Sequence, residues 1–335
     1  MRAAVAPMAV LLTAALAVPA ITPAPTDAQS VEIEEWQVPW EDSRPRDPYV
    51  GPDGRVWFVG QRSNYAAYLD PATGEFTRLD LPEGAGPHNL IVADNGTVWY
   101  AGNRDMHIGR IDPSSGAIEK FEMPTPDARD PHTLIWDGSS IVFTLQGANM
   151  VGRMDTVSKT VELADVPTAQ SRPYGINLAP DGRAWVAQLG TNKLLRVNPE
   201  TLELQEIELP REEARPRRLE VTSDGRVWYV DYAEGYLGAY DPSRGTFEEW
   251  RAPRAGESRP YGMEVDARDR LWFVETGPRG EPNQFVGFDP ERETFIAKTQ
   301  IPSGAGTVRH MYYHEPTNTI WFGTDANTIG RAQLP

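Results

Sequence analysis

The sequence predicts an all-β protein, a seven-bladed β-propeller whose last blade is closed by the N-terminal strand. Three observations support this prediction. A strand phrase centred on tryptophan recurs along the chain at intervals of 42 to 49 residues. Asp-Gly or Asn-Gly pairs, which favour tight hairpins, precede most of these phrases. The final repeat has no fourth strand, whereas the chain begins with a spare one at residues 31–39. Four short antiparallel strands per ~43 residues are typical of a propeller blade.

The recurring phrase defines the second strand of each repeat. It reads Val56-Trp57-Phe58, Val98-Trp99-Tyr100, Ile141-Val142-Phe143, Ala184-Trp185-Val186, Val227-Trp228-Tyr229, Leu271-Trp272-Phe273 and Ile320-Trp321-Phe322. A third strand follows in several repeats with an Ile-Gly-Arg pattern. In the first six repeats a turn then leads to a polar-alternating fourth strand that ends at proline. We expect the tryptophans to lie between adjacent blades and the spare strand 31–39 to complete the seventh.

The first 28 residues have the pattern of a secretory signal peptide. Arg2 precedes a mostly apolar stretch over residues 3–20, and small residues follow near positions 20 and 28. The alternative is an N-terminal membrane anchor, but the apolar run is short and is interrupted by Pro7 and Pro19. We therefore predict a cleaved signal at 1–28, a single propeller domain at 29–335, and a periplasmic or extracellular product.

Composition narrows the function classes. The 335 residues include no cysteine, which excludes disulfides, thiolate metal sites and a cysteine nucleophile. The formal net charge of −16 argues against a nucleic-acid partner and against an anionic membrane surface. We expect a monomer that binds a small ligand, because channel mouths are common ligand sites in closed β architectures.

Each repeat has a turn that leads into its innermost strand, and most of these turns share a proline. Innermost strands line the central channel, so residues at one repeat position should lie at one height around it. The residue after the shared proline (Val308 in the last repeat) predicts a ring of Tyr49, His88, His132, Tyr174, Arg217, Tyr261 and Arg309. A second polar ring is predicted from Gln61, Asn103, Gln146, Gln188, Asp231, Glu275 and Asp325. The alternative is that these polar residues only solvate the channel.

Several of these phrases resemble the virginiamycin B lyase family, also called streptogramin lyases. The clearest are Arg172-Pro173-Tyr174-Gly175-Ile176, Arg259-Pro260-Tyr261-Gly262-Met263, Leu271-Trp272-Phe273-Val274-Glu275 and the stretch from Phe143 to Arg153. The resemblance runs over most of residues 31–335. It implies a seven-bladed propeller and a Mg²⁺-dependent elimination that opens a cyclic depsipeptide at an ester.

The resemblance also implies a site of two histidines and two acids in the family's last two blades. At the corresponding positions this chain has Tyr261, Thr307, Arg309 and Asp325. The pattern reappears elsewhere in the ring, as His88 in one repeat and Asp130-Pro131-His132 in the next. Gln146 then stands where the family has a glutamate.

This rotated pattern leads to a set of site predictions. We expect His132 to be the base of an elimination and His88 to act as an acid or to orient the substrate. Asp130 and Gln146 are the expected Mg²⁺ ligands. The residues expected to bind the ligand are Tyr49, Tyr174, Arg217, Tyr261 and Arg309, the two arginines through a carboxylate or oxyanion.

Two function classes remain open from the sequence. The first is a carbon–oxygen lyase or related enzyme that acts on a cyclic peptide, lactone or ester in the channel mouth. The second is a non-catalytic secreted propeller that binds a ligand, a sugar or a protein through the same residues. A third, a six-bladed lactonase-like metal hydrolase, conflicts with the count of seven repeats.

Overall fold

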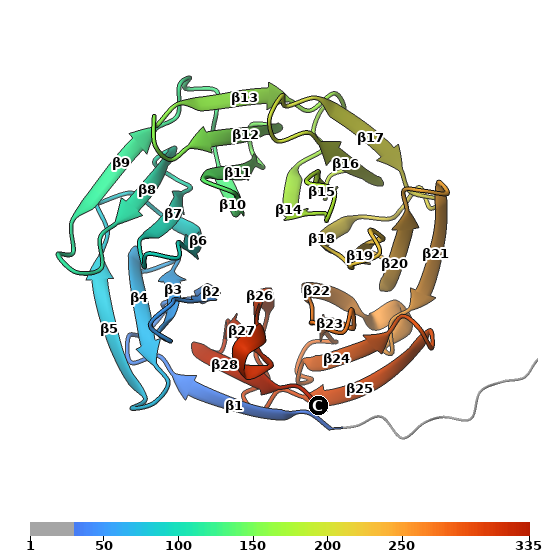
Figure 1. The fold of residues 1–335 in the computed structure, drawn as a ribbon. Coiled ribbons are helices and arrows are strands. Elements are labelled where there is room, and N and C mark those ends of the chain that lie inside the picture. The colour runs from blue at the N-terminus through green and yellow to red at the C-terminus, as the bar shows by residue number, and fades with distance from the viewer. Residues whose placement is uncertain (1–29) are drawn as a thin grey trace, which may run out of the picture.

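Seven four-stranded antiparallel sheets form a closed ring around a central channel (Figure 1) in a computed structural model that describes residues 30–335. In each sheet the strands follow one another in chain order from the channel to the rim, except in the last blade. The predicted seven-bladed propeller is therefore confirmed. The predicted signal at 1–28 lies outside the described residues. Within residues 30–335 no helix has the length and apolarity needed to cross a membrane.

Blades 1 to 4 have regular four-strand order. Blade 1 contains β2 (Pro45–Val50), β3 (Val56–Gly60), β4 (Tyr65–Asp70) and β5 (Glu75–Asp80). Blade 2 contains β6 (Pro87–Val92), β7 (Val98–Gly102), β8 (His107–Ile111) and β9 (Ile118–Glu122). Blade 3 contains β10 (Pro131–Asp137), β11 (Ser140–Leu145), β12 (Met150–Asp155) and β13 (Val161–Asp165). Blade 4 contains β14 (Pro173–Leu178), β15 (Ala184–Gln188), β16 (Lys193–Val197) and β17 (Leu204–Glu208).

Blades 5 to 7 complete the ring. Blade 5 contains β18 (Pro216–Val221), β19 (Val227–Asp231), β20 (Tyr236–Asp241) and β21 (Thr246–Arg251). Blade 6 contains β22 (Arg259–Val265), β23 (Leu271–Thr276), β24 (Gln284–Asp289) and β25 (Thr294–Gln300). Blade 7 contains β26 (Val308–His314), β27 (Thr319–Thr324), β28 (Thr328–Gln333) and, outermost, β1 (Glu32–Gln37). Two short 3₁₀ turns, η1 (Ala255–Glu257) and η2 (Glu315–Thr317), flank β22 and β26.

The N-terminal strand closes the ring as predicted. β1 pairs antiparallel with β28 in a register that places Glu32 opposite Gln333, and Figure 1 shows the two strands side by side at the rim. Trp36 stacks on Trp321 with ring centroids 5.5 Å apart. The carboxylate of Glu35 accepts hydrogen bonds from Ser303 and Thr328. This closure covers the edge of β28 and brings the two ends of the propeller chain together in one blade.

The hydrophobic core is divided into clusters that each span two neighbouring blades. Trp57 of blade 1 packs in one cluster with Leu90 and Tyr100 of blade 2, and Trp228 of blade 5 packs with Phe273 of blade 6. The second strands are buried on both faces, whereas the outermost strands alternate between exposed and half-buried residues. The recurring tryptophans therefore join the blades, as the sequence predicts.

An asparagine in the left-handed conformation ties each of two blades to the next. Asn64 has φ of 55°, and its amide donates to the carbonyl oxygens of Leu81 and Pro82 while its Oδ1 accepts from Gly86 N–H. Asn149, at φ of 61°, makes the equivalent bonds two blades further on. Asparagine tolerates this conformation better than most residues. These bonds fix the loops from which the inner strands enter the channel.

Deleting residues 29–38 from a chain that begins at residue 29 should lower the melting temperature and cause aggregation. The deletion removes β1 and its pairing with β28, and it leaves an unpaired sheet edge on blade 7. Thermal unfolding and light scattering would measure both effects. The control is the chain that begins at residue 29 with β1 intact. If the two chains melted at the same temperature, β1 would not close the ring.

Candidate functional site

Every inner strand breaks its hydrogen-bond ladder just after it begins. A bulge or register shift follows Pro87, Pro131, Pro173, Pro216, Pro260, Val308 and, in β2, Arg46. Bulges redirect side chains, and here the residues at the break face the channel. We call the end of the channel where the inner strands begin the entry mouth, and the opposite end the exit mouth.

The register assigns one residue from each blade to the entry mouth, directly after the first residue of the aligned inner strands. This entry ring consists of Arg46, His88, His132, Tyr174, Arg217, Tyr261 and Arg309. Six members agree with the sequence prediction. The placement of Tyr49 in this ring is wrong, because Pro45 and not Pro48 is the equivalent of Pro87. Tyr49 pairs opposite Trp57, three residues deeper, and faces the exit mouth.

Aromatic side chains of the entry ring meet one another. The His88 and His132 ring centroids are 3.6 Å apart, and those of His132 and Tyr174 are 4.0 Å apart. The hydroxyl groups of Tyr174 and Tyr261 are hydrogen-bonded. His132 is 1% exposed and His88 6%. The two histidines, which the ring places on neighbouring blades, lie with their rings tilted and in direct contact, so no ligand-sized gap separates them.

Both histidines are neutral at physiological pH. Burial, with the nearby positive charges of Arg46 and Arg218, holds the pKa of each imidazole well below its ordinary value of 6.5. His132 Nδ1 lies 2.8 Å from Thr133 Oγ1. Among the described residues, His132 Nε2 and His88 Nδ1 have no hydrogen-bond partner.

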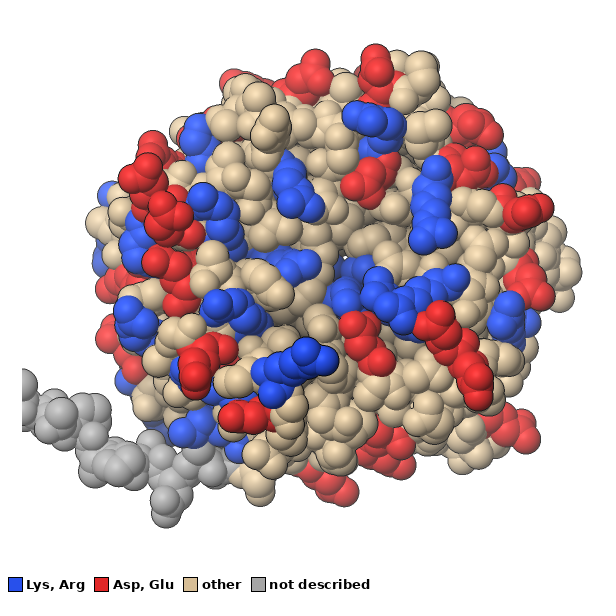
Figure 2. All heavy atoms as spheres, turned by 180° about the vertical axis from the view of Figure 1, so that it is seen from behind, with Lys and Arg blue, Asp and Glu red and all other residues tan. Residues whose placement is uncertain are grey.

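The entry mouth is strongly cationic. The Arg217 guanidinium lies 3.7 Å from the centroid of Tyr261 and 4.3 Å from that of Tyr232, and its Nε has no partner among the described residues. Burial alone would raise the pKa of Tyr174, yet the charges of Arg217 and neighbouring arginines lower it to about 8. Figure 2 shows this face, with Lys and Arg side chains gathered around the central opening.

A buried polar layer lies directly beneath the entry ring. Arg46 Nε donates to Asp47 Oδ1 at 3.1 Å, and Asn89 Nδ2 donates to Asp47 Oδ2 at 3.0 Å. Arg218 crosses the channel, where its Nε donates to Arg309 O and its Nη1 to Thr133 Oγ1. Arg218 also lies 3.8 Å from Asp47. Two arginines therefore share one carboxylate in the middle of the channel.

Gly175 makes room for this crossing arginine. A Cβ atom at this position would lie 2.9 Å from Arg217 O and 3.0 Å from Arg218 Cα. Such contacts are shorter than side chains tolerate, so any larger residue would push β14 away from β18. The Pro-Tyr-Gly phrase thus reflects a close approach of two inner strands.

The predicted metal ligands Asp130 and Gln146 do not form a cluster with the histidines. The Asp130 carboxylate accepts hydrogen bonds from the Asn103 side chain and from Gly147 N–H. Gln146 contacts Asp130 through its backbone, its N–H donating to Asp130 O at 3.1 Å. Within residues 30–335, no group of three or more His, Asp or Glu side chains has the arrangement of a metal site. These donors do not fit a Mg²⁺ ion.

The last-blade positions at which the family resemblance implies a histidine and an acid do not fit Mg²⁺ either. Arg309 forms a two-point ion pair with Asp325, with Nη2 to Oδ2 at 2.7 Å. Arg44 Nε lies 3.6 Å from the same carboxylate. Two guanidinium groups thus face the one acid that the chain retains there, where a divalent cation would need several oxygen ligands.

The second polar ring that the sequence predicts is largely structural. Asp231, Glu275 and Gln188 are fully buried. Asp231 Oδ1 accepts from Arg215 N–H and Ala233 N–H, and Glu275 accepts from Arg254 N–H. These bonds hold the loops that precede the inner strands. The alternative, that these residues only solvate the channel, does not describe Asp231 and Glu275, which are buried and bonded to loop backbone.

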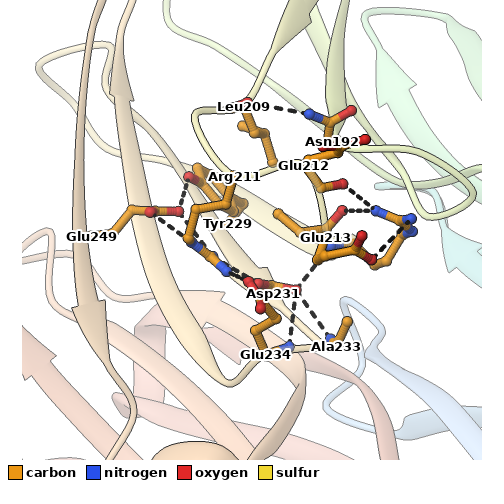
Figure 3. A network of polar contacts seen from close by, with 12 residues as sticks. Asn192, Leu209, Arg211, Glu212, Glu213, Tyr229, Asp231, Ala233, Glu234 and Glu249 are labelled. Atoms are coloured by element: carbon orange, nitrogen blue, oxygen red, sulfur yellow. Dashed lines mark hydrogen bonds and ion pairs between the residues drawn. The ribbon is translucent and has the colours of Figure 1, made fainter.

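The blade 5 loop is held by the network shown in Figure 3. Arg211 donates to both carboxylate oxygens of Glu249, at 2.8 and 3.0 Å, and to Asp231 Oδ2 at 2.7 Å. It also pairs with Glu234. Tyr229 donates to Glu249 at 2.8 Å. This network fixes the loop that leads to Arg217.

A cavity of about 290 Å³ lies at the exit mouth, and the sequence analysis did not predict it. Its side chains include Tyr49, Ile91, Ile135, Asn177, Glu220, Glu264 and Tyr312. Each of these pairs opposite the central residue of the recurring strand phrase, from Trp57 to Trp321. Aligning this repeat position would have revealed two acids on adjacent blades. Arg218 and His310 also line the cavity.

The fold and the channel side chains define a seven-bladed propeller with a polar channel that is cationic at one end. The chain belongs to the Virginiamycin B lyase family, whose model matches residues 25–279. The match ends before β24, so the last blade, with Arg309 and Asp325, lies outside it. A search of curated protein sequences finds no match.

Solved structures support the fold. The chain is similar to a streptogramin B lyase, with 24% identity, a TM-score of 0.80, and coverage of 91% of this chain and 98% of that one. It is similar to a virginiamycin B lyase from Staphylococcus aureus, with 24% identity, a TM-score of 0.81, and coverage of 91% and 100%. It also resembles the extracellular domain of the one-component system BT4673 from B. thetaiotaomicron, with 16% identity, a TM-score of 0.67, and coverage of 91% and 40%. At these identities the likeness shows the fold alone.

Asp231→Ala should destabilise the protein by about 3–5 kcal/mol, because it leaves three backbone N–H groups without their buried acceptor and removes one of the three carboxylates that pair with Arg211. Glu248→Ala, which removes an exposed carboxylate of the same blade, is the matched control and should cost less than about 1 kcal/mol. Urea unfolding followed by circular dichroism measures both. Equal effects of the two substitutions would contradict a structural role for Asp231.

Proposed function

We propose that this chain is a non-catalytic binding propeller that takes an organic anion, such as a carboxylate, at its entry mouth. The observation that carries the proposal is the Arg309–Asp325 ion pair, with Arg44 beside it, at positions where the family resemblance implies a histidine and an acid. A guanidinium pair at this position favours an anionic ligand and disfavours Mg²⁺.

The charge balance of the entry mouth supports an anion. Arg44, Arg217 and Arg309 face it, whereas Asp325 is shared by two of them. Arg217, with Arg46 and Arg218, also lowers the pKa of Tyr174 to about 8. An anion would be held by charge-assisted hydrogen bonds, with the tyrosine rings as apolar walls.

The lyase that the resemblance implies, with Mg²⁺ and a cyclic depsipeptide or lactone substrate, is the competing hypothesis. Its base would be His132, which is 1% exposed and stacked between His88 and Tyr174. A proton α to a carbonyl must reach within about 3 Å of the base. The solved relative from Staphylococcus aureus described with quinupristin supplies the probe for a direct test.

We expect citrate to bind the full mature chain, and Arg217→Ala to weaken binding about ten- to a hundred-fold, because a charge-assisted hydrogen bond is lost. Isothermal titration at two salt concentrations measures the affinity and its electrostatic part. Arg244→Ala, at an exposed turn of blade 5, is the control and should bind like the unaltered chain. Spermidine should not bind at the entry mouth.

The same preparation decides between the two classes. Incubation with quinupristin and Mg²⁺, followed by mass spectrometry, should give no linearised product. Mg²⁺-dependent opening of quinupristin that is lost in His132→Ala would overturn the proposal in favour of the lyase. Equal citrate affinity in the unaltered chain and in Arg217→Ala would contradict an anion site at the entry mouth.

We also propose that the protein is exported, on the basis of the signal pattern in residues 1–28. Mass spectrometry of the protein from a cell that expresses the whole chain should find an N-terminus between residues 21 and 32. Recovery of the chain with Met1 intact in the membrane fraction would contradict export by cleavage and would support an N-terminal anchor.

A further inference from the structure

We propose that the cavity at the exit mouth is a second binding site, for a small organic ammonium ion with an aliphatic body. The proposal is independent of the anion site, since the two lie at opposite ends of the channel. It rests on the shape of the cavity, on two carboxyl groups that face it from adjacent blades, and on its apolar wall.

The two carboxyl groups occupy equivalent positions on neighbouring inner strands. Glu220 of β18 pairs opposite Trp228, and Glu264 of β22 pairs opposite Trp272. Both line the cavity of about 290 Å³. Glu220 is 7% exposed, and its carboxyl group accepts a hydrogen bond from the Asn177 side chain. Glu264 accepts from the backbone N–H groups of Val265, at 3.2 Å, and Tyr313, at 3.1 Å.

No cation among the described residues forms an ion pair with either carboxyl group. Arg218 is the arginine at the cavity, but its nitrogens are directed to Thr133, to Arg309 O and toward Asp47. Arg46 shares Asp47 with Arg218, so part of the charge of Arg218 is not offset, and this charge partly counters the burial that raises the pKa of Glu220 and Glu264 without forming an ion pair with either. Two acids, one buried and one half-buried, that have only this charge near them are costly to ionise, and a bound ammonium would supply further positive charge.

The rest of the cavity suits an aliphatic body. Ile91, Ile135 and Trp136 form the wall across from the two acids, and Tyr49 and Tyr312 stack between them with ring centroids 4.2 Å apart. Aromatic faces also attract ammonium groups. A volume of about 290 Å³ accommodates a branched chain of five or six heavy atoms and excludes a large peptide.

The inner end of the cavity carries a second, independent sign of a ligand. Arg218 is 4% exposed and lines the cavity, and its Nη2, which lies 3.8 Å from Asp47 Oδ2, makes no hydrogen bond among the described residues. His310 Nδ1, also on the cavity wall, has no partner there either. Native proteins seldom leave buried polar groups unsatisfied. An amine that also bears a carboxylate would satisfy them, so both simple amines and amino acids belong to the class.

Binding should release a proton. Burial raises the pKa of Glu264 to about 8, so this carboxyl group is mostly protonated at pH 7 and must ionise to pair with an ammonium. The groups that face it are Glu220 and Arg218 from β18, Tyr49 from β2, and His310, Tyr312 and Tyr313 from β26. Burial lowers the pKa of His310 to about 3, so His310 stays neutral in this range.

The test uses the full mature chain and three probes of similar shape at pH 7.5: 3-methylbutylammonium, L-leucine and the uncharged 3-methylbutan-1-ol. Isothermal titration in two buffers of different ionisation enthalpy measures affinity and proton release. We expect the ammonium to bind about ten-fold or more tightly than the alcohol, with release of a fraction of a proton. L-leucine tests whether the natural ligand is an amine or an amino acid. If L-leucine binds more tightly than 3-methylbutylammonium, the site is assigned to amino acids. If it binds more weakly, the site is assigned to amines.

Glu220→Gln with Glu264→Gln should remove the preference for the ammonium over the alcohol while the fold is kept. The matched control is Glu208→Gln with Glu248→Gln, which removes two exposed carboxylates and should leave affinity unchanged. Arg217→Ala at the entry mouth should also bind the ammonium normally. Should the double Gln variant fail to fold, Glu220→Gln alone replaces it. Equal binding of alcohol and ammonium, or an unchanged affinity in the folded Gln variant, would overturn the proposal.

Discussion

The break in the ladder at the start of every inner strand determines what the channel contains. A regular strand would point alternate side chains into the channel, but a bulge directs neighbouring residues to the same side. Arg217 and Arg218 illustrate the effect, since the first lies against Tyr261 at the entry mouth and the second crosses the channel to Thr133. Seven such breaks at one height bring many polar groups into a space only a few side chains wide.

Charge is separated along the channel as a result. Arginines dominate the entry mouth, two glutamates face the exit mouth, and Asp47 lies between them in contact with Arg46 and Arg218. Burial weakens the screening by water, so each group alters its neighbours. Positive charges lower the pKa of Tyr174 to about 8 at one end, while burial raises that of Glu264 to about 8 at the other. An anion at the entry mouth and a cation at the exit mouth would complement these charges.

The sequence predicted those features that depend on local chemistry or on repetition. The blade count, the closing strand and the position of the tryptophans between blades follow from the number and spacing of the repeats. The entry ring was right at six of seven positions. It failed at Tyr49 because β2 contains both Pro45 and Pro48, and only the pairing of Pro45 with Gly60 shows which proline begins the strand.

Side-chain direction could not be predicted in the same way. The spacing of Asp130 and His132 suggested a shared metal, but Asp130 has φ of 64° and its carboxylate is bonded to Asn103. That backbone conformation depends on the loop of the next hairpin and leaves no trace in the spacing. The exit cavity was missed for a different reason. Its acids lie opposite the tryptophans, at a repeat position that is aliphatic or aromatic in four blades of seven, and only an alignment of that position shows Glu220 and Glu264.

This chain differs from the family pattern at positions in the entry ring, where a side chain can be replaced without altering the backbone. Each blade contributes one side chain to the entry ring, and the bulge, the asparagine turns and the Asp231 network hold the backbone without help from that side chain. Replacing an acid or a histidine by arginine at one such position therefore changes the charge of the mouth at little cost to the fold. The cost is high where a charge is buried, as it is for Asp47 and Arg218 in the layer beneath and for Arg46 within the ring, because each of these charges must be balanced by another. The ring positions that solvent reaches, such as Arg309, can therefore vary more freely than the buried charges that lie next to them.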